Sequence, residues 1–156
     1  MNDKKYFKVA VGGTFDKFHD GHKKLLSTAF ELGNRVEIGV TSDAFGGLKG
    51  DIDSCEERMS NLKLFFSGKS NFNVVPLEDP FGTTIYEEDF DAIVVSEETE
   101  PNAIKINDIR VSKGMKPLDI VVVSFVLAED GNPISSTRIR RGEINKNGLI
   151  IENQKN

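Results

Sequence analysis

One stretch near the amino end, residues 7–32, constrains the fold more than any other part of the chain. It begins with a short apolar run over residues 7–11, which is typical of a strand buried on both faces. Gly12 and Gly13 then interrupt this run, where the backbone must turn sharply or approach another group closely. An amphipathic helix follows, because its apolar residues recur at a spacing near 3.6: Leu25, Leu26, Ala29, Phe30 and Leu32.

The same succession of apolar strands and helices continues along the chain. Further strands are expected at residues 36–41, 72–77, 91–95 and 119–127. Strands that alternate with helices predict parallel pairing with right-handed crossovers. We therefore expect an α/β fold with one domain spanning residues 1–156, a Rossmann-like open parallel sheet of about five strands with helices on both faces.

Capping and breaking residues place the connecting helices. Asp53 or Ser54 can cap a second helix that Gly68 ends, and its expected apolar face consists of Met59, Leu62, Phe65 and Phe66. Pro101 begins a third helix that runs toward Gly114, and a short helical turn is expected near residues 85–89. A turn at Asn34 and Arg35 and a polar, glycine-rich loop over residues 42–50 complete the expected connections.

Composition narrows the classes of protein to which the chain can belong. A net charge of −5 argues against a general nucleic-acid binder. No apolar run approaches the ~20 residues of a membrane span. The single cysteine, Cys55, cannot form an internal disulfide, so we expect a packing role for it and a cytoplasmic protein.

The only two histidines, His19 and His22, lie between the first strand and its helix. A strand, a glycine turn and a helix N-terminus form an anion site, because free N–H groups and the positive end of the helix dipole meet there. Two histidines at this spacing are also compatible with a metal site or with ordinary surface positions. The chain offers no third histidine to complete a zinc set. We therefore interpret this corner as a phosphate site.

A second candidate site follows the turn at residues 131–133. Residues 134–142 predict a helix N-terminus with hydroxyl groups at its cap and basic residues one turn later. At about 100° per residue, Ser136 shares a face with Arg140, and Thr137 shares one with Arg140 and Arg141, whereas Arg138 points elsewhere. Hydroxyl groups and a guanidinium on one face suit phosphate oxygens, although an ordinary capped helix with a solvated basic face would have the same sequence.

These two stretches together resemble the signatures of a known superfamily. Residues 12–22, which read G-G-T-F-D-x-x-H-x-G-H, and residues 134–140, which read I-S-S-T-x-x-R, are similar to the two motifs of the nucleotidylyltransferases. Residues 75–82, 94–99 and 106–110 resemble segments of the archaeal and eukaryotic phosphopantetheine adenylyltransferases. The resemblance covers residues 7–142.

This resemblance implies a reaction in coenzyme A biosynthesis: ATP and 4′-phosphopantetheine give dephospho-coenzyme A and pyrophosphate. It implies catalytic roles for His22 and Lys49, and acceptor phosphate binding by Thr14 and Lys49. It implies Mg²⁺ held mainly by ATP phosphates and no metal site built by the chain. Asp16 is expected to be a hydrogen-bond acceptor that stabilises the turn, and the alternative role for it is that of a metal ligand. The expected nucleotide-binding residues are Gly12, Gly13, Thr14, Phe15, His19, His22, Ser96, Glu97, Asn107, Arg110, Ser135, Ser136, Thr137 and Arg140.

Two alternatives remain open at the level of sequence. Nicotinamide-mononucleotide and flavin-mononucleotide adenylyltransferases share both main motifs, so the acceptor could differ. A module that binds ATP without turnover is the alternative of another class. We expect no nucleic-acid or membrane partner, and the sequence leaves the oligomeric state open.

Overall fold

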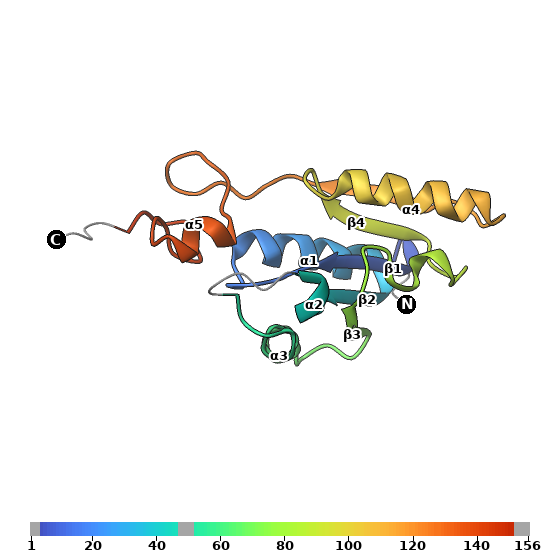
Figure 1. Ribbon diagram of the computed structural model, residues 1–156, viewed down its shortest axis with the longest axis horizontal. Helices are drawn as coiled ribbons and strands as arrows, with labels where there is room; N and C mark the ends of the chain where they lie inside the picture. Colours follow the sequence, from blue (N-terminus) through green and yellow to red (C-terminus); the bar gives the residue numbers. More distant parts are fainter. Residues whose placement is uncertain (1–3, 47–51, 152–156) are drawn as a thin grey trace.

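The computed structural model describes residues 4–46 and 52–151, and Figure 1 shows its elements in chain order. One sheet of five strands has the order β3-β2-β1-β4-β5, and every neighbouring pair is parallel. The strands are β1 (Tyr6–Gly13), β2 (Gly33–Thr41), β3 (Phe72–Leu77), β4 (Ala92–Ser96) and β5 (Asp119–Val123). The predicted Rossmann-like open sheet is therefore confirmed.

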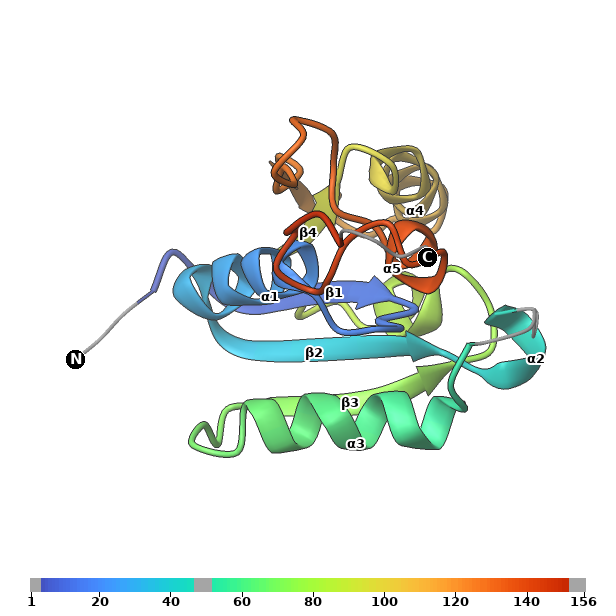
Figure 2. The ribbon, with the colours of Figure 1, turned by 90° about the vertical axis from the view of Figure 1, so that its left-hand side faces the viewer.

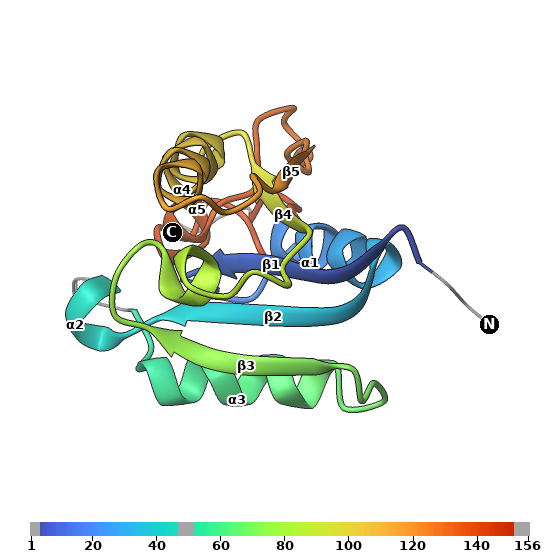
Figure 3. The same ribbon diagram turned by 90° about the vertical axis from the view of Figure 1, so that its right-hand side faces the viewer.

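Helices cover both faces of this sheet, as predicted. On one face, α1 (Asp20–Leu32) packs against β1 and β2, and α3 (Cys55–Phe65) packs against β2 and β3. Leu26 and Leu62 join Val9 and Val11 of β1 in one buried apolar cluster there. On the other face, α4 (Glu100–Ser112) packs against β4 and β5. Figure 3 shows α4 beside β4 at one end of the sheet and α3 beside β3 at the other.

Three shorter helical segments complete the structure: α2 (Asp43–Gly46), the 3₁₀ segment η1 (Gly82–Ile85) and α5 (Ser136–Arg140). The carboxyl end of β1 points toward α5 in both Figure 1 and Figure 2. This arrangement brings the two sequence motifs to the same edge of the sheet. Across the described residues, no helix has the length and apolarity needed to cross a membrane.

Two expected connections are wrong. Residues 42–50 were expected to form a loop, but Asp43–Gly46 form the short helix α2, where the Ser42 hydroxyl accepts a hydrogen bond from the Phe45 amide at 3.0 Å. The rest of that predicted loop, residues 47–50, lies outside the described residues. Asn34 and Arg35 were expected in a turn, but β2 begins at Gly33 and Arg35 pairs with Lys8 of β1. The chain thus passes from α1 into β2 without a separate turn.

The boundaries of other elements also differ from the sequence prediction. The last strand ends at Val123 instead of residue 127, because β4 ends at Ser96, which pairs with Val123 and leaves no further ladder partner. The predicted helical turn at residues 85–89 lies earlier, at η1, because the Asp79 carboxylate binds the amides that begin it. Helix α3 ends before Gly68 and leaves Phe65 51% exposed, so Phe65 does not belong to its buried face.

Gly33 stands where α1 meets β2 and has no room for a side chain. A Cβ atom there would lie 2.7 Å from a Val9 methyl group and 2.9 Å from the Arg35 carbonyl oxygen. We expect Gly33→Ala to lower the free energy of unfolding by roughly 1–3 kcal/mol, as measured by urea denaturation, because the core must shift to accept the methyl group. Gly68→Ala is the matched control, since nothing lies within 4 Å of its added Cβ. Equal effects at the two positions would contradict this account.

Candidate active site

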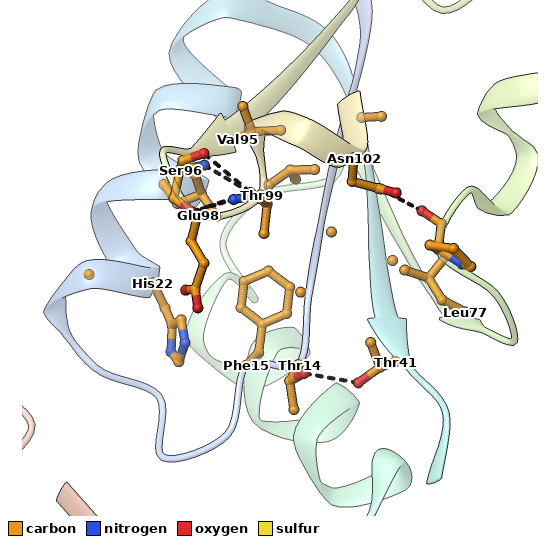
Figure 4. A pocket seen from close by; sticks show the side chains of 18 of the residues that line it. Thr14, Phe15, His22, Thr41, Leu77, Val95, Ser96, Glu98, Thr99 and Asn102 are labelled. Carbon is orange, nitrogen blue, oxygen red and sulfur yellow. Dashed lines mark hydrogen bonds between the residues drawn. The ribbon is translucent and has the colours of Figure 1, made fainter. Parts of the chain in front are cut away.

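A cavity of about 1,120 Å³ opens at the carboxyl ends of β1, β2 and β4. Helix α1 begins at its rim, and the first turn of α5 closes another side. Figure 4 shows it in a close view. The volume slightly exceeds the ~300–1,000 Å³ of a typical small-molecule site. Most predicted site residues line it: Gly12, Gly13, Thr14, Phe15, His19, His22, Ser96, Ser135, Ser136, Thr137 and Arg140.

His19 is the N-cap of α1. Its Nδ1 accepts hydrogen bonds from the Gly21 amide at 3.0 Å and from the His22 amide at 3.4 Å. His22 reciprocates, because its Nδ1 accepts from the His19 amide at 3.2 Å. This is the geometry of a capping box, built here from two imidazoles instead of Ser and Glu. The two rings stack with their centroids 3.7 Å apart.

The loop between β1 and α1 is shaped to hold this pair. A Cβ atom on Gly21 would lie 2.9 Å from Cε1 of His19, so only glycine lets the His19 ring fold back over the first turn. Phe15 is buried and adopts a left-handed backbone conformation with φ of 55°, which is rare for an aromatic residue. Its ring meets the His22 ring edge-on, with centroids 5.3 Å apart. A strained backbone at such a position is typical of a functional site.

Both imidazoles are neutral at physiological pH. Burial lowers the pKa of His19 to about 4, against a smaller opposing effect of Asp20. Burial also lowers the pKa of His22 to about 3, and the adjacent His19 adds to this. Because each Nδ1 accepts a hydrogen bond from an amide, the proton of each neutral ring must reside on Nε2. The pair therefore offers two fixed N–H donors without carrying charge.

This arrangement corrects the sequence-based account of the phosphate corner. Free backbone N–H groups at the start of the first helix were expected to bind the anion. In the structure, the Asp20 amide donates to the Lys146 carbonyl oxygen, and the next two amides donate to His19 Nδ1. The His19 side chain thus accepts from these backbone donors, and the Nε2–H groups are the ring donors left at this corner.

Asp16 connects the first sequence motif to the second. Its carboxylate is 2% exposed and accepts from Arg140 Nη1 at 2.7 Å and from the Asp53 amide at 2.9 Å. Its carbonyl oxygen accepts from the Ser136 hydroxyl at 2.5 Å. Asp16 is therefore an acceptor that holds the turn, as predicted, and it also orients Arg140.

The helical register predicted for α5 is confirmed. Arg140 Nη2 lies 3.3 Å from the Thr137 hydroxyl, on the side that lines the cavity. Arg138 turns away and pairs with Asp130 and Glu143. Arg140 is the only cationic side chain among the described residues that line the cavity.

The β4–α4 connection forms another wall of the cavity. The hydroxyls of Ser96 and Thr99 lie 3.2 Å apart, and the Asn102 amide donates to the Pro80 carbonyl oxygen at 2.7 Å. Figure 4 shows these contacts and the Glu98 side chain, which points toward His22. Thr14 and Thr41 meet on the opposite side, where their hydroxyls are 3.2 Å apart.

Comparison with known proteins identifies the family. The model of the cytidylyltransferase-like family matches residues 10–142. The chain is 54% identical over 151 residues to a phosphopantetheine adenylyltransferase of Methanothermobacter thermautotrophicus, covering 96% of this chain and 92% of that one. The chain belongs to the phosphopantetheine adenylyltransferase family. A second member, from Methanopyrus kandleri, is 50% identical over 148 residues and covers 91% of this chain and 93% of its own.

A solved structure supports this assignment at the level of the fold. A protein with unknown function from Archaeoglobus fulgidus superposes with a TM-score of 0.68 at 38% sequence identity. The match covers 76% of this chain and 98% of that one. The fold described above is thus shared with a crystal structure of a similar sequence.

Three residues that the sequence predicts to bind the nucleotide do not line the cavity. Glu97 is exposed and does not line the cavity, whereas the adjacent Glu98 does. Asn107 bonds both the amide and the carbonyl of Leu118. Arg110 is fully buried and donates to the carbonyl oxygens of Lys116, Thr84 and Glu87. Neither Asn107 nor Arg110 lines the cavity, and both side chains bond backbone groups of loops instead.

Two other observations concern the predicted site of this family member. Lys49, predicted as catalytic and acceptor-binding, lies outside the described residues. Sequence reasoning missed the tie between Asp16 and Arg140, the cavity wall at Thr99 and Asn102, and the buried Arg58. No local sequence pattern predicts these contacts, because each depends on which distant segments the sheet brings together.

The protonation state of the histidines can be tested directly. Since the native pKa values lie below the ordinary 6.5, we expect neither imidazole to titrate between pH ~8 and ~5.5 in NMR spectra, and both to carry their proton on Nε2. Below about pH 6.5 the unfolded chain binds protons that the native state does not. The free energy of unfolding should therefore fall as the pH is lowered toward 4. A ring that titrates near its ordinary pKa in the folded protein would contradict the assigned Nδ1 acceptor role.

Proposed function

We propose that this protein transfers the adenylyl group of ATP to 4′-phosphopantetheine, giving dephospho-coenzyme A and pyrophosphate in coenzyme A biosynthesis. The observation that carries this proposal is the nearly full-length identity of 54% to a phosphopantetheine adenylyltransferase. The geometry supports it, because the motif that follows β1 and the motif that forms α5 meet at one cavity.

The cavity has two sides of different chemistry, which suit two different substrates. Ser96, Thr99 and Arg140 provide polar groups on the side of β4 and α5, which suits a nucleotide with its phosphates. Leu77 and Phe81 provide an apolar wall beyond Thr14 on the side of β2 and β3, which suits the flexible arm of the acceptor. We therefore assign ATP to the first side and 4′-phosphopantetheine to the second, so that the two phosphate groups meet near Thr14 and His22.

The reaction needs positioning and charge stabilisation more than proton transfer. An oxygen of the acceptor phosphate attacks the α-phosphorus of ATP, and the bond from that phosphorus to the bridging oxygen breaks to release pyrophosphate. The second pKa of a phosphate monoester is about 6, so the attacking group is mostly a dianion at neutral pH and needs no general base. In-line positioning and donors for the oxygens of the α-phosphoryl group supply the catalysis.

We assign these donors to residues that the fold holds rigidly before substrates arrive. His22 offers its Nε2–H to the α-phosphoryl group, and the stacked His19 offers its own to the adjacent phosphate. Arg140, with Ser136 and Thr137 beside it, suits the phosphates that leave as pyrophosphate. An Arg guanidinium forms the strongest of these contacts, because hydrogen bonds to it are charge-assisted.

Magnesium fits this site through the substrate instead of the chain. Among residues 4–46 and 52–151, no group of three His, Cys, Asp or Glu side chains is arranged to hold a metal ion. The buried carboxylate in the site, Asp16, is already bonded by Arg140 and by the Asp53 amide. We infer that ATP brings Mg²⁺ on its β- and γ-phosphate oxygens, where the ion would neutralise the charge of the leaving group.

The choice of acceptor is tested by product mass. Purified protein is incubated with ATP, Mg²⁺ and one acceptor at a time: 4′-phosphopantetheine, nicotinamide mononucleotide or flavin mononucleotide. We expect dephospho-coenzyme A and an equal amount of pyrophosphate from the first mixture only. Product from another acceptor would reassign the substrate, and ATP binding without pyrophosphate release from any mixture would favour the binding module.

Arg140 and Arg138 form a matched pair for testing the nucleotide side. Both lie in α5, but only Arg140 lines the cavity. Arg140→Ala should weaken ATP binding by about 1.5–3 kcal/mol, the range for hydrogen bonds to charged groups, as measured by calorimetric titration. Arg138→Ala should change the affinity much less, since that side chain contacts Asp130 and Glu143. Similar losses in both variants would refute the assignment of Arg140 to the ATP phosphates.

A further inference from the structure

Arg58 is a charged residue in a position where an apolar one would be expected. It lies in α3 and is 1% exposed, in the same buried layer as Leu62. Charged side chains are almost never fully buried unless they are paired. Its nearest carboxylate, Asp43, lies 3.3 Å away and is itself half exposed.

The donors of Arg58 converge on the backbone that borders the cavity. Nη1 lies 2.9 Å from the carbonyl oxygens of both Thr14 and Thr41, and 3.3 Å from the Thr41 hydroxyl. Nε donates to the Asp53 carbonyl oxygen at 2.8 Å. One guanidinium thus joins the loop after β1, the carboxyl end of β2 and the segment before α3.

These contacts extend to the side chain of Thr14 through Thr41. The Thr41 hydroxyl, which Arg58 contacts, lies 3.2 Å from the Thr14 hydroxyl. An apolar residue could attach α3 to the sheet equally well, but it could not bond the two carbonyl oxygens.

The charge of Arg58 has a second effect. The protein carries a net charge of −5, and Arg140 is the only cation among the described residues that line the cavity. Arg58 places a positive charge behind Thr14, one hydrogen bond away from its carbonyl oxygen, where little water is present to screen it. A dianionic phosphate beside Thr14 would therefore be attracted from behind the wall of the cavity.

We propose that Arg58 is a positioning residue for the acceptor: it fixes Thr14 and Thr41 and supplies a buried positive charge on the side where the phosphate of 4′-phosphopantetheine binds. This inference rests on the proposed function. It predicts that loss of Arg58 affects the acceptor more than ATP, because the nucleotide contacts come mainly from α1, β4 and α5.

The test compares Arg58→Met and Arg58→Lys with the wild-type protein in the dephospho-coenzyme A assay. Arg58→Met keeps the length and apolar stem of the side chain and removes its donors and charge. We expect the KM for 4′-phosphopantetheine to rise at least tenfold and kcat to fall, while the KM for ATP changes less than threefold. Arg58→Lys keeps the positive charge but lacks the forked guanidinium, so it should retain part of the activity that Arg58→Met loses.

Leu62→Ala is the matched control, because Leu62 is fully buried in the same helix and contacts neither threonine through hydrogen bonds. It should lower the midpoint of thermal unfolding and the fraction of active protein, and leave both KM values unchanged. If Arg58→Met behaved like Leu62→Ala, or raised both KM values equally, Arg58 would be merely structural and the inference would fail. A wild-type protein that made no dephospho-coenzyme A would instead overturn the proposed function, and the inference with it.

Discussion

The contact between Asp16 and Arg140 is the interaction on which the rest of the site depends. These residues are 124 positions apart in the chain, yet their side chains meet at 2.7 Å. A buried carboxylate needs such a partner, because an uncompensated charge at 2% exposure would be strongly destabilising. Pairing therefore satisfies a folding requirement and at the same time sets the direction in which Arg140 faces the cavity.

The corner at the start of α1 follows a different principle, since it relies on neutral groups. Each histidine uses one ring nitrogen to complete the start of α1 and keeps the other as a donor. A neutral donor that is already held in place needs little reorientation when charge develops on a phosphoryl oxygen. The cost of burying two imidazoles is met by the helix cap and by stacking on each other and on aromatic rings.

Much of the fold was predictable because it follows from local patterns. Buried parallel strands give uninterrupted apolar runs, and the cap at Ser54 and the register of Arg140 follow from helix geometry. What failed depended on tertiary context: Arg110 resembles a ligand-binding arginine in sequence, but folding turns it inward to three carbonyl oxygens. The role of Arg58 could not be predicted for the same reason, since nothing in the adjacent sequence indicates that β1 and β2 end beside it.

The segment after β5 has a consequence for how the molecule folds. Up to residue 151, where the described part of the chain ends, its own apolar cluster has Ala128, Ile134 and Ile144 as buried members, too few to order nearly thirty residues alone. Polar contacts with Asp16 and Asp20 hold it against the sheet. A nucleotide bound between α1 and α5 would add to those contacts, and by mass action it would stabilise the native state. Under the proposed assignment of ATP to this side of the cavity, the substrate would therefore also help to keep the last segment in place.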